Sequence, residues 1–192
     1  LFGGLYHLQG YHDLVLVSST DGVGTKLKLA QWLDRYESIG HDVVNQSVND
    51  VLTTGARPLF FLDYVAVPSL DSVHLEALIK GVADACRNAG CALLGGETSQ
   101  LTDVFTPGSF ELVGFVVGAA ERDALLDPLS VSQGDILLAL PSSGLHTNGY
   151  SLVRTVFDLE RDQSTLREQS PELGRTLGEA LLEPHRSYWP ML

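Results

Sequence analysis

The sequence is poor in basic side chains and in long apolar runs. Its 192 residues carry 12 Lys and Arg against 24 Asp and Glu, a formal net charge of −12. That sign is opposite to what a phosphate-tracking nucleic-acid binder or a polybasic membrane anchor requires. The apolar run near 112–120 is interrupted by Gly114 and Gly118 and is far shorter than the roughly 20 residues of a spanning helix. We therefore expect no nucleic acid and no membrane among the partners.

Sulfur is also scarce. Cys86 lies in a helical pattern and Cys91 opens a strand-like run, and there is no second pair to complete a zinc site. We expect reduced thiols in the core of a cytoplasmic protein, with a redox role as the less favoured alternative. No secretory signal is visible. The single methionine is Met191 and residue 1 is a leucine, so we expect the chain to be a fragment of a longer product.

What is present is a globular composition, with 44% hydrophobic and 19% charged residues. Apolar periodicity predicts strands alternating with helices. The predicted strands are 14–19, 58–67, 91–98, 110–121 and 135–142, and the predicted helices are 26–33, 41–54, 72–88, 149–159 and 174–182. Because only a loop joins 91–98 to 110–121, the pattern favours the α+β class, with a mixed or antiparallel sheet.

The first candidate for chemistry is a glycine-rich segment between the strand 14–19, expected to be buried, and the helix that begins near Lys26. Glycines at 22 and 24 let the backbone approach a phosphate, and Thr25 and Lys26 add a hydroxyl and a positive charge. The spacing is not that of a P-loop. A plain structural turn remains an equal alternative.

The second candidate is the polar face of the helix 41–54. This face carries only carboxylates and amides after His41, whereas valines and a leucine cluster on the other face. Oxygen ligands of this kind suit Mg²⁺. A solvated acidic face is the alternative. The residues of the polar face are Asp42, Asn45, Gln46, Asn49 and Asp50.

Two further candidates lie at the ends of predicted strands. Glu97 follows two glycines, which clear space for a close neighbour, although a glycine-lined turn with an exposed glutamate would also explain this pattern. The segment 142–149 leads into a helix with a dense set of hydrogen-bond donors, more than helix capping needs, and favours oxyanion binding over capping. Its candidate residues are Ser142, Ser143, His146, Thr147, Asn148 and Gly149.

Taken together, these segments resemble the phosphoribosylformylglycinamidine cyclo-ligase family, in the family's order and through most of the chain. Related ATP-dependent enzymes share the general plan. The matching segments are SSTDGVGTKLKLA (18–30), IGHDVVNQSVND (39–50), GARPLFFLDYVAV (55–67), GCALLGGET (90–98) and PSSGLHTNGYSLVR (141–154). The chain departs from the family pattern after Thr98, where Gln100 replaces a usual glutamate.

The resemblance implies two α+β domains, helices on one face of the sheet, and a homodimer whose N-terminal sheets join. Residues 1–159 would be the N-terminal ATP- and metal-binding domain, and 160–192 a linker and the start of a C-terminal domain that is missing here. The implied activity is ATP-dependent ring closure of formylglycinamidine ribonucleotide, with ATP and Mg²⁺ as cofactors. The alternatives are a non-catalytic nucleotide-binding dimerisation module and a sister ATP-dependent enzyme acting on another substrate.

Carried over by position, the resemblance implies three kinds of site residue. Asp21, Asp50 and Glu97 would face the metal, and the segment 142–149 would hold a phosphate, the ribonucleotide phosphate in the first instance. The residues implied near the nucleotide are Gly22, Gly24, Thr25, Lys26 and Asn49.

Overall fold

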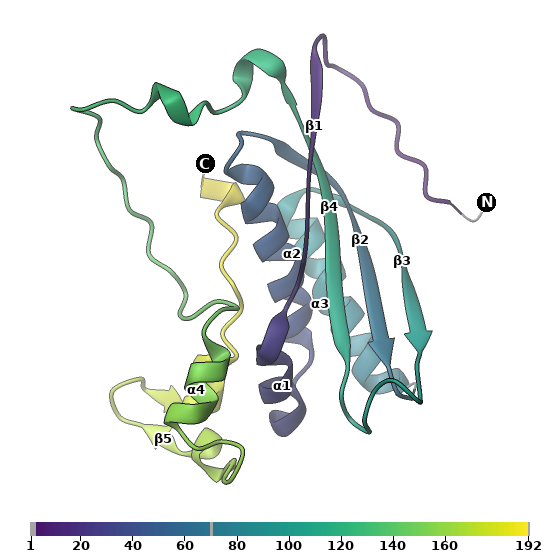
Figure 1. Cartoon of the computed structure of the whole chain (residues 1–192), viewed down its shortest axis with the longest axis vertical. Coiled ribbons are helices and arrows are strands. Elements are labelled where there is room, and N and C mark those ends of the chain that lie inside the picture. Colours follow the sequence, from purple (N-terminus) through teal and green to yellow (C-terminus); the bar gives the residue numbers. More distant parts are fainter. Residues whose placement is uncertain (1–2, 70, 192) are drawn as a thin grey trace.

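The structure is a computed structural model that describes residues 3–69 and 71–191. Its main sheet orders the strands β1-β4-β2-β3, and α2 and α3 lie along one face of that sheet (Figure 1). The elements are β1 (Leu14–Gly22), α1 (Leu27–Leu33), α2 (Glu37–Leu52), β2 (Arg57–Val67), α3 (Ser72–Ala89), β3 (Ala92–Gln100), β4 (Glu111–Glu121), α4 (Tyr150–Val156), β5 (Gln169–Ser170), β6 (Arg175–Thr176) and α5 (Leu177–Leu181).

The main sheet is mixed, which confirms the predicted α+β class. Strand β4 pairs antiparallel with both β1 and β2, whereas β2 pairs parallel with β3. A parallel pair needs a long crossover, and α3 supplies it between β2 and β3. Strands β3 and β4 follow each other in sequence but are not neighbours in the sheet, because β2 lies between them.

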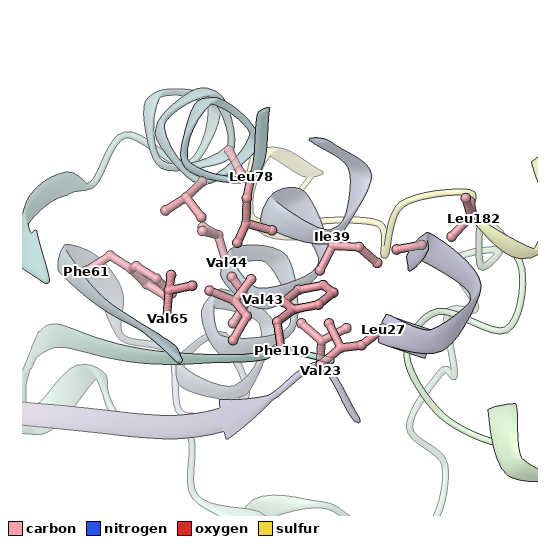
Figure 2. Packing of buried hydrophobic residues seen from close by; sticks show 14 of the residues in the cluster. Val23, Leu27, Ile39, Val43, Val44, Phe61, Val65, Leu78, Phe110 and Leu182 are labelled. Atoms are coloured by element: carbon pink, nitrogen blue, oxygen red, sulfur yellow. The ribbon is translucent and has the colours of Figure 1, made fainter. Parts of the chain in front are cut away.

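The core lies between the sheet and the two long helices. Val43 and Val44 of α2 meet Phe61 and Val65 of β2, and Leu78 of α3 closes the other side (Figure 2). All five side chains are almost fully buried. Each such burial stabilises the fold by roughly 1.5–3 kcal/mol. The apolar stripe expected on α3 is therefore a packing stripe.

Helices α2 and α3 approach each other closely at a pair of glycines. A Cβ atom at Gly81 would collide with the carbonyl oxygen of Glu37, and one at Gly40 would collide with the carbonyl oxygen of Leu78. Neither collision can be relieved by a side-chain rotation, because the obstacle is backbone. The two glycines thus set the distance at which α2 is held, and α2 carries many of the candidate site residues.

Two predicted strands differ from the structure. The first extends through Gly22 and is not buried: its outward side chains are exposed, among them Leu16 at 59%. Residues 135–142 form no strand, and Leu137 and Leu138 are about nine-tenths exposed. A strand needs a hydrogen-bonded partner, and the described residues place none beside this segment, which arches away from the sheet (Figure 1).

The part of the chain after α4 packs against the same core. Leu159, Leu166, Leu181 and Leu182 belong to one hydrophobic cluster with Leu27 of α1. Side chains on both sides of position 160 therefore share a core, and the domain boundary placed there stays a prediction.

Both cysteines are buried and free. Among the described residues, no helix combines the length and the hydrophobicity that crossing a bilayer demands.

Substituting Gly81 by alanine should destabilise the fold. Although alanine is intrinsically the better helix residue by about 1 kcal/mol, the added Cβ forces α3 away from α2, and overpacking of this kind typically costs about 1–3 kcal/mol. Urea unfolding followed by circular dichroism would measure the loss. Glu76→Ala, at an exposed position of the same helix, is the control and should change little. Equal stability of Gly81→Ala and the parent chain would contradict the close approach.

Candidate functional site

An open pocket of about 470 Å³ lies where the end of β1, the polar face of α2, the segment 142–149 and the C-terminal tail meet. We call it the Asp21–Asp50 pocket, and we use "the tail" for residues 183–189. The pocket collects residues from five separate parts of the sequence, the fifth being the loop at Leu126. Its lining residues are Asp21, Gln46, Asn49, Asp50, Leu52, Thr53, Leu126, Thr147, Asn148, His185 and Tyr188.

The two carboxylates predicted as metal ligands line this pocket together. Asp21 is exposed at the end of β1, and its Oδ1 accepts a hydrogen bond from the backbone N–H of Gly22 at 2.8 Å. Asp50 is exposed on α2 and accepts from Ser19 Oγ at 2.6 Å. Neither carboxylate has a cationic side chain within 4.0 Å among the residues that the structure describes. The pocket therefore presents unbalanced negative charge.

The glycine-rich segment is less open than its sequence indicates. Gly22 belongs to β1, and its carbonyl accepts from Gln46 Nε2 at 2.9 Å, while the N–H of Val23 donates to Leu112 O at 3.3 Å. Gly24 has a φ of 72° and open space around its Cα. Thr25 is exposed, with its hydroxyl 3.3 Å from Ser151 Oγ. Gly24 and Thr25 begin a short 3₁₀ helix, Gly24–Lys26, and are the part of the segment that could face a phosphate.

Lys26 points inward and forms a buried ion pair. Its Nζ lies 2.8 Å from Asp42 Oδ2 and 2.9 Å from Oδ1, and both side chains are fully buried. Burial lowers the pKa of Lys26 and raises the pKa of Asp42 to about 6, and each charge opposes the shift of the other. Asp42 is therefore ionised at neutral pH, and the short contact is that of an ammonium with a carboxylate.

The polar face of α2 is neither solvated nor open, because the tail lies along it. Asn45 Nδ2 donates to His185 O at 2.6 Å, and Asp42 Oδ1 accepts from the N–H of His185 at 2.7 Å. Asn49 uses both ends of its amide, donating to Arg186 O at 2.8 Å and accepting from the N–H of Tyr188 at 2.9 Å. Three side chains of α2 thus bind the tail through its backbone, and Asp50 alone on this face remains exposed.

Part of the segment 142–149 also contacts the tail. Ser143 Oγ donates to Pro184 O at 2.7 Å, and His146 Nε2 accepts from the N–H of Ser143 at 3.2 Å. Thr147 is buried, with its hydroxyl 3.2 Å from His185 Nδ1. Ser142, Asn148 and Gly149 stay exposed. These three residues are the ones that remain open to a phosphate.

Two histidines stack inside this contact. The rings of His146 and His185 are 4.0 Å apart and inclined by 17°. Burial lowers the pKa of both imidazoles, to about 4 for His185, and the neighbouring charge of Lys26 adds to the shift of each. Both rings are therefore neutral at pH 7, which suits a stacked pair that would repel itself if both members were charged.

Glu97 is not part of the pocket. It lies exposed on β3 opposite Tyr64 of β2, and β3 and β1 are opposite edges of the main sheet. Three strand spacings of about 4.8 Å put it about 14 Å from β1. Within residues 3–69 and 71–191, no three His, Cys, Asp or Glu side chains are placed to hold a metal ion. A metal held by Asp21, Asp50 and Glu97 of one chain does not fit this geometry.

Sequence reasoning missed the tail as a component of the pocket. His185 and Tyr188 line it, yet only the unusual polar content of an otherwise apolar ending marks them in the sequence. The amides of Asn45 and Asn49 were a second signal, because a helix face rich in amides calls for hydrogen-bonding partners.

A larger hollow of about 920 Å³ opens elsewhere, between the start of α2 and the β5–β6 hairpin. Arg35, Arg175 and Glu179 are among its lining residues. None of the residues predicted for the site lines it, and its mixed charges favour no one ligand. The Asp21–Asp50 pocket is therefore the candidate site.

Acid should loosen the tail through His185. Since the pKa of His185 is about 4 in the folded chain and 6.5 when free, the unfolded state binds more protons between these values, and stability falls as pH drops from about 6.5 to 4. The loss is at most about 1.4 kcal/mol for each pH unit. Unfolding free energies measured across this window should decline more steeply for the parent chain than for His185→Gln.

The matched control for this pH series is His7→Gln, which removes an exposed histidine. Its profile should run parallel to that of the parent chain. The pKa of Asp42 is raised to about 6, so its contribution makes the fold more stable as pH falls over part of the same range. Only the difference between variant and parent therefore isolates the contribution of His185. Parallel profiles for His185→Gln and the parent would contradict the assignment.

Comparison with known proteins shows which family the chain belongs to. The family model described as "AIR synthase related protein, N-terminal domain" matches residues 5–120. A protein of Thermoanaerobacter sp. (strain X514) is 49% identical over 187 residues, and one of Carboxydothermus hydrogenoformans is 51% identical over 189; each match covers 97% of this chain and 55% of the relative. Both relatives carry the name phosphoribosylformylglycinamidine cyclo-ligase. The chain thus spans about half the length of these relatives.

Solved structures support the fold. A structure described as AaThiL complexed with AMPPCP and TMP aligns with a TM-score of 0.53 at 19% identity, over 92% of this chain and 50% of that one. Hydrogenase maturation protein HypE in complex with ATP aligns with a TM-score of 0.50 at 20% identity, over 66% of this chain and 36% of that one. On the extent of the family match and of the identity to its relatives, the chain belongs to the AIR synthase related protein family and contains its N-terminal domain.

Proposed function

We propose that this chain is part of an ATP-dependent phosphoribosylformylglycinamidine cyclo-ligase of purine biosynthesis, acting in the cytoplasm. The observation that carries the proposal is the identity of about one residue in two over 97% of the chain to relatives of that name. In the proposed reaction, ATP phosphorylates the formamide oxygen of formylglycinamidine ribonucleotide, the amidine nitrogen closes the ring, and phosphate leaves. The products are aminoimidazole ribonucleotide, ADP and phosphate.

The Asp21–Asp50 pocket suits this chemistry only with a divalent cation. Two carboxylates without a cationic neighbour would repel the phosphates of ATP, and phosphoryl transfer depends on positioning and charge neutralisation. Mg²⁺ is commonly held by one or two carboxylates together with substrate phosphates, and Asp21 and Asp50 line one pocket. The donor set therefore fits Mg²⁺ bound with a nucleotide, in which the ion would neutralise the phosphate oxygens.

The remaining roles follow from exposure. Gly24 and Thr25 are open beside the end of β1 and would face the nucleotide phosphates, whereas Ser142 and Asn148 would face the phosphate of the ribonucleotide. Glu97, on the far edge of the sheet, would meet this site only through a second subunit. Residues 160–192 would lead into a further domain, and the apolar residues near 135–140, which lie exposed, would pack against it.

Replacing Asp50 by asparagine should weaken binding of Mg-ATP to the chain by at least about tenfold, because an amide cannot neutralise the cation. A tenfold change in affinity corresponds to about 1.4 kcal/mol of binding free energy. Isothermal titration calorimetry with Mg-ATP measures the change. ATP with a chelator should bind the parent chain and the variant equally weakly.

Asp103→Asn, at an exposed loop position, is the matched control and should leave the affinity as it is in the parent. Unchanged Mg-ATP affinity in Asp50→Asn would remove Asp50 from the metal site. The activity is tested separately, in a polypeptide of the relatives' full length, as phosphate release that requires formylglycinamidine ribonucleotide.

We further propose that the chain forms a homodimer through the face of the main sheet that α2 and α3 leave uncovered (Figure 1). Leu14 and Leu16 of β1, Tyr64 of β2 and Phe115 of β4 point to that face and are more than a third exposed. An apolar sheet face of this kind is typical of an interaction surface. Glu97 shares the face with Tyr64, since the two are opposite each other in the ladder.

Sedimentation equilibrium should therefore give about twice the chain mass of 20.8 kDa. Leu16→Asp would place a charge in the buried interface and shift the population to monomer. Leu152→Asp, on exposed α4, adds the same charge elsewhere and should remain dimeric. A dimer that survives Leu16→Asp would exclude this face as the interface.

A further inference from the structure

The ammonium group of Lys26 has no donor left for a ligand. Besides Asp42, it donates to His146 O at 3.1 Å and to Glu183 O at 2.8 Å. A lysine ammonium has three hydrogens, so these three residues use all of them. The side chain is also fully buried. A lysine that binds a phosphate needs a free donor and access to solvent, and Lys26 has neither.

The three partners of Lys26 belong to three separate segments. Asp42 is on α2, His146 is in the segment 142–149, and Glu183 begins the tail. Each segment continues directly into a wall of the Asp21–Asp50 pocket: Gln46 and Asn49 follow on α2, Thr147 follows His146, and His185 follows Glu183. Lys26 is therefore the point at which these walls are joined.

His146 shows that this junction is under constraint. Its φ of 57° is left-handed, a conformation that costs a non-glycine residue on the order of 1 kcal/mol or more. That conformation goes together with a carbonyl oxygen that accepts from Lys26 Nζ and lies 3.1 Å from Tyr150 Oη. The one hydroxyl hydrogen of Tyr150 has a nearer acceptor in Leu181 O, at 2.6 Å. The carbonyl of His146 is thus held by Lys26.

We propose that Lys26 is a positioning residue, which holds the segment 142–149 and the tail against α2 and so forms the Asp21–Asp50 pocket without touching a phosphate. The inference on Lys26 itself stands on the geometry of the chain alone. Its consequence for nucleotide binding rests on the proposed function.

The first test needs no ligand. Trypsin can cleave the tail after Arg186, whose backbone carbonyl is held by Asn49. In Lys26→Met, a neutral side chain of similar length, cleavage at Arg186 should be at least tenfold faster than in the parent, as followed by mass spectrometry. Lys28→Met, at an exposed lysine two residues later in α1, is the matched control and should cleave at the parental rate.

Circular dichroism separates release of the tail from unfolding. Helical signal from α2 and α3 should persist in Lys26→Met at 25 °C. If that variant does not fold, Lys26→Gln, which keeps two donors without the charge, replaces it, and its tail should also be cleaved faster. Cleavage at the parental rate in a folded Lys26 variant would overturn the proposal.

The second test distinguishes positioning from phosphate binding. Arginine binds phosphate at least as well as lysine does, so a phosphate ligand would tolerate Lys26→Arg. A fully buried junction would not, because the guanidinium is larger than the ammonium that it replaces and Lys26 is 0% exposed. Calorimetry should show that Lys26→Arg loses at least tenfold in affinity for Mg-ATP and gains tail cleavage, and parental affinity would contradict positioning.

The cleavage test and the calorimetric test can fail independently of each other. If the parent chain itself binds no Mg-ATP, the proposed nucleotide site is absent from this chain, while the cleavage experiment still decides the role of Lys26. If Mg-ATP binds but Lys26→Met leaves the tail protected, the nucleotide site stands and the positioning role is wrong.

Discussion

A buried ammonium and a buried carboxylate, Lys26 and Asp42, hold together the part of the molecule that carries the candidate site. Removing one partner from such a pair usually costs about 3–5 kcal/mol, because the other charge stays buried without compensation. The pair also binds the tail: Asp42 accepts a hydrogen bond from the N–H of His185, and Lys26 donates one to the carbonyl of Glu183. The geometry of the pocket therefore depends on an interaction that lies outside the pocket itself.

Much of the framework could be predicted because it is local. The apolar stripe on α3 has helical spacing, and the runs of β2, β3 and β4 carry the period and composition of strands. The joining of 91–98 to 110–121 by a loop alone favoured a mixed sheet, as found. What the sequence could not supply was strand order, since β2 enters between β3 and β4 through contacts distant along the chain.

The site was predictable in composition and less so in arrangement. Asp21 and Asp50 line one pocket, but Lys26 points away from it and Asn49 is bound to the tail. A polar residue has the same identity whether it meets a ligand, water or another backbone segment, and only the folded chain decides among them. The same limit applies to residues 135–142, where apolar character alone predicted a strand that the structure does not form.

The exposed segment 135–142 also affects the association of chains in solution. Ile136, Leu137 and Leu138 are consecutive and exposed, and they belong to no strand of the described part of the chain, a combination that promotes strand-to-strand pairing between molecules. The net charge of −12 opposes such association through mutual repulsion, which salt screens. Solubility of the isolated chain should thus fall as ionic strength rises, the reverse of what a simple polar surface would give.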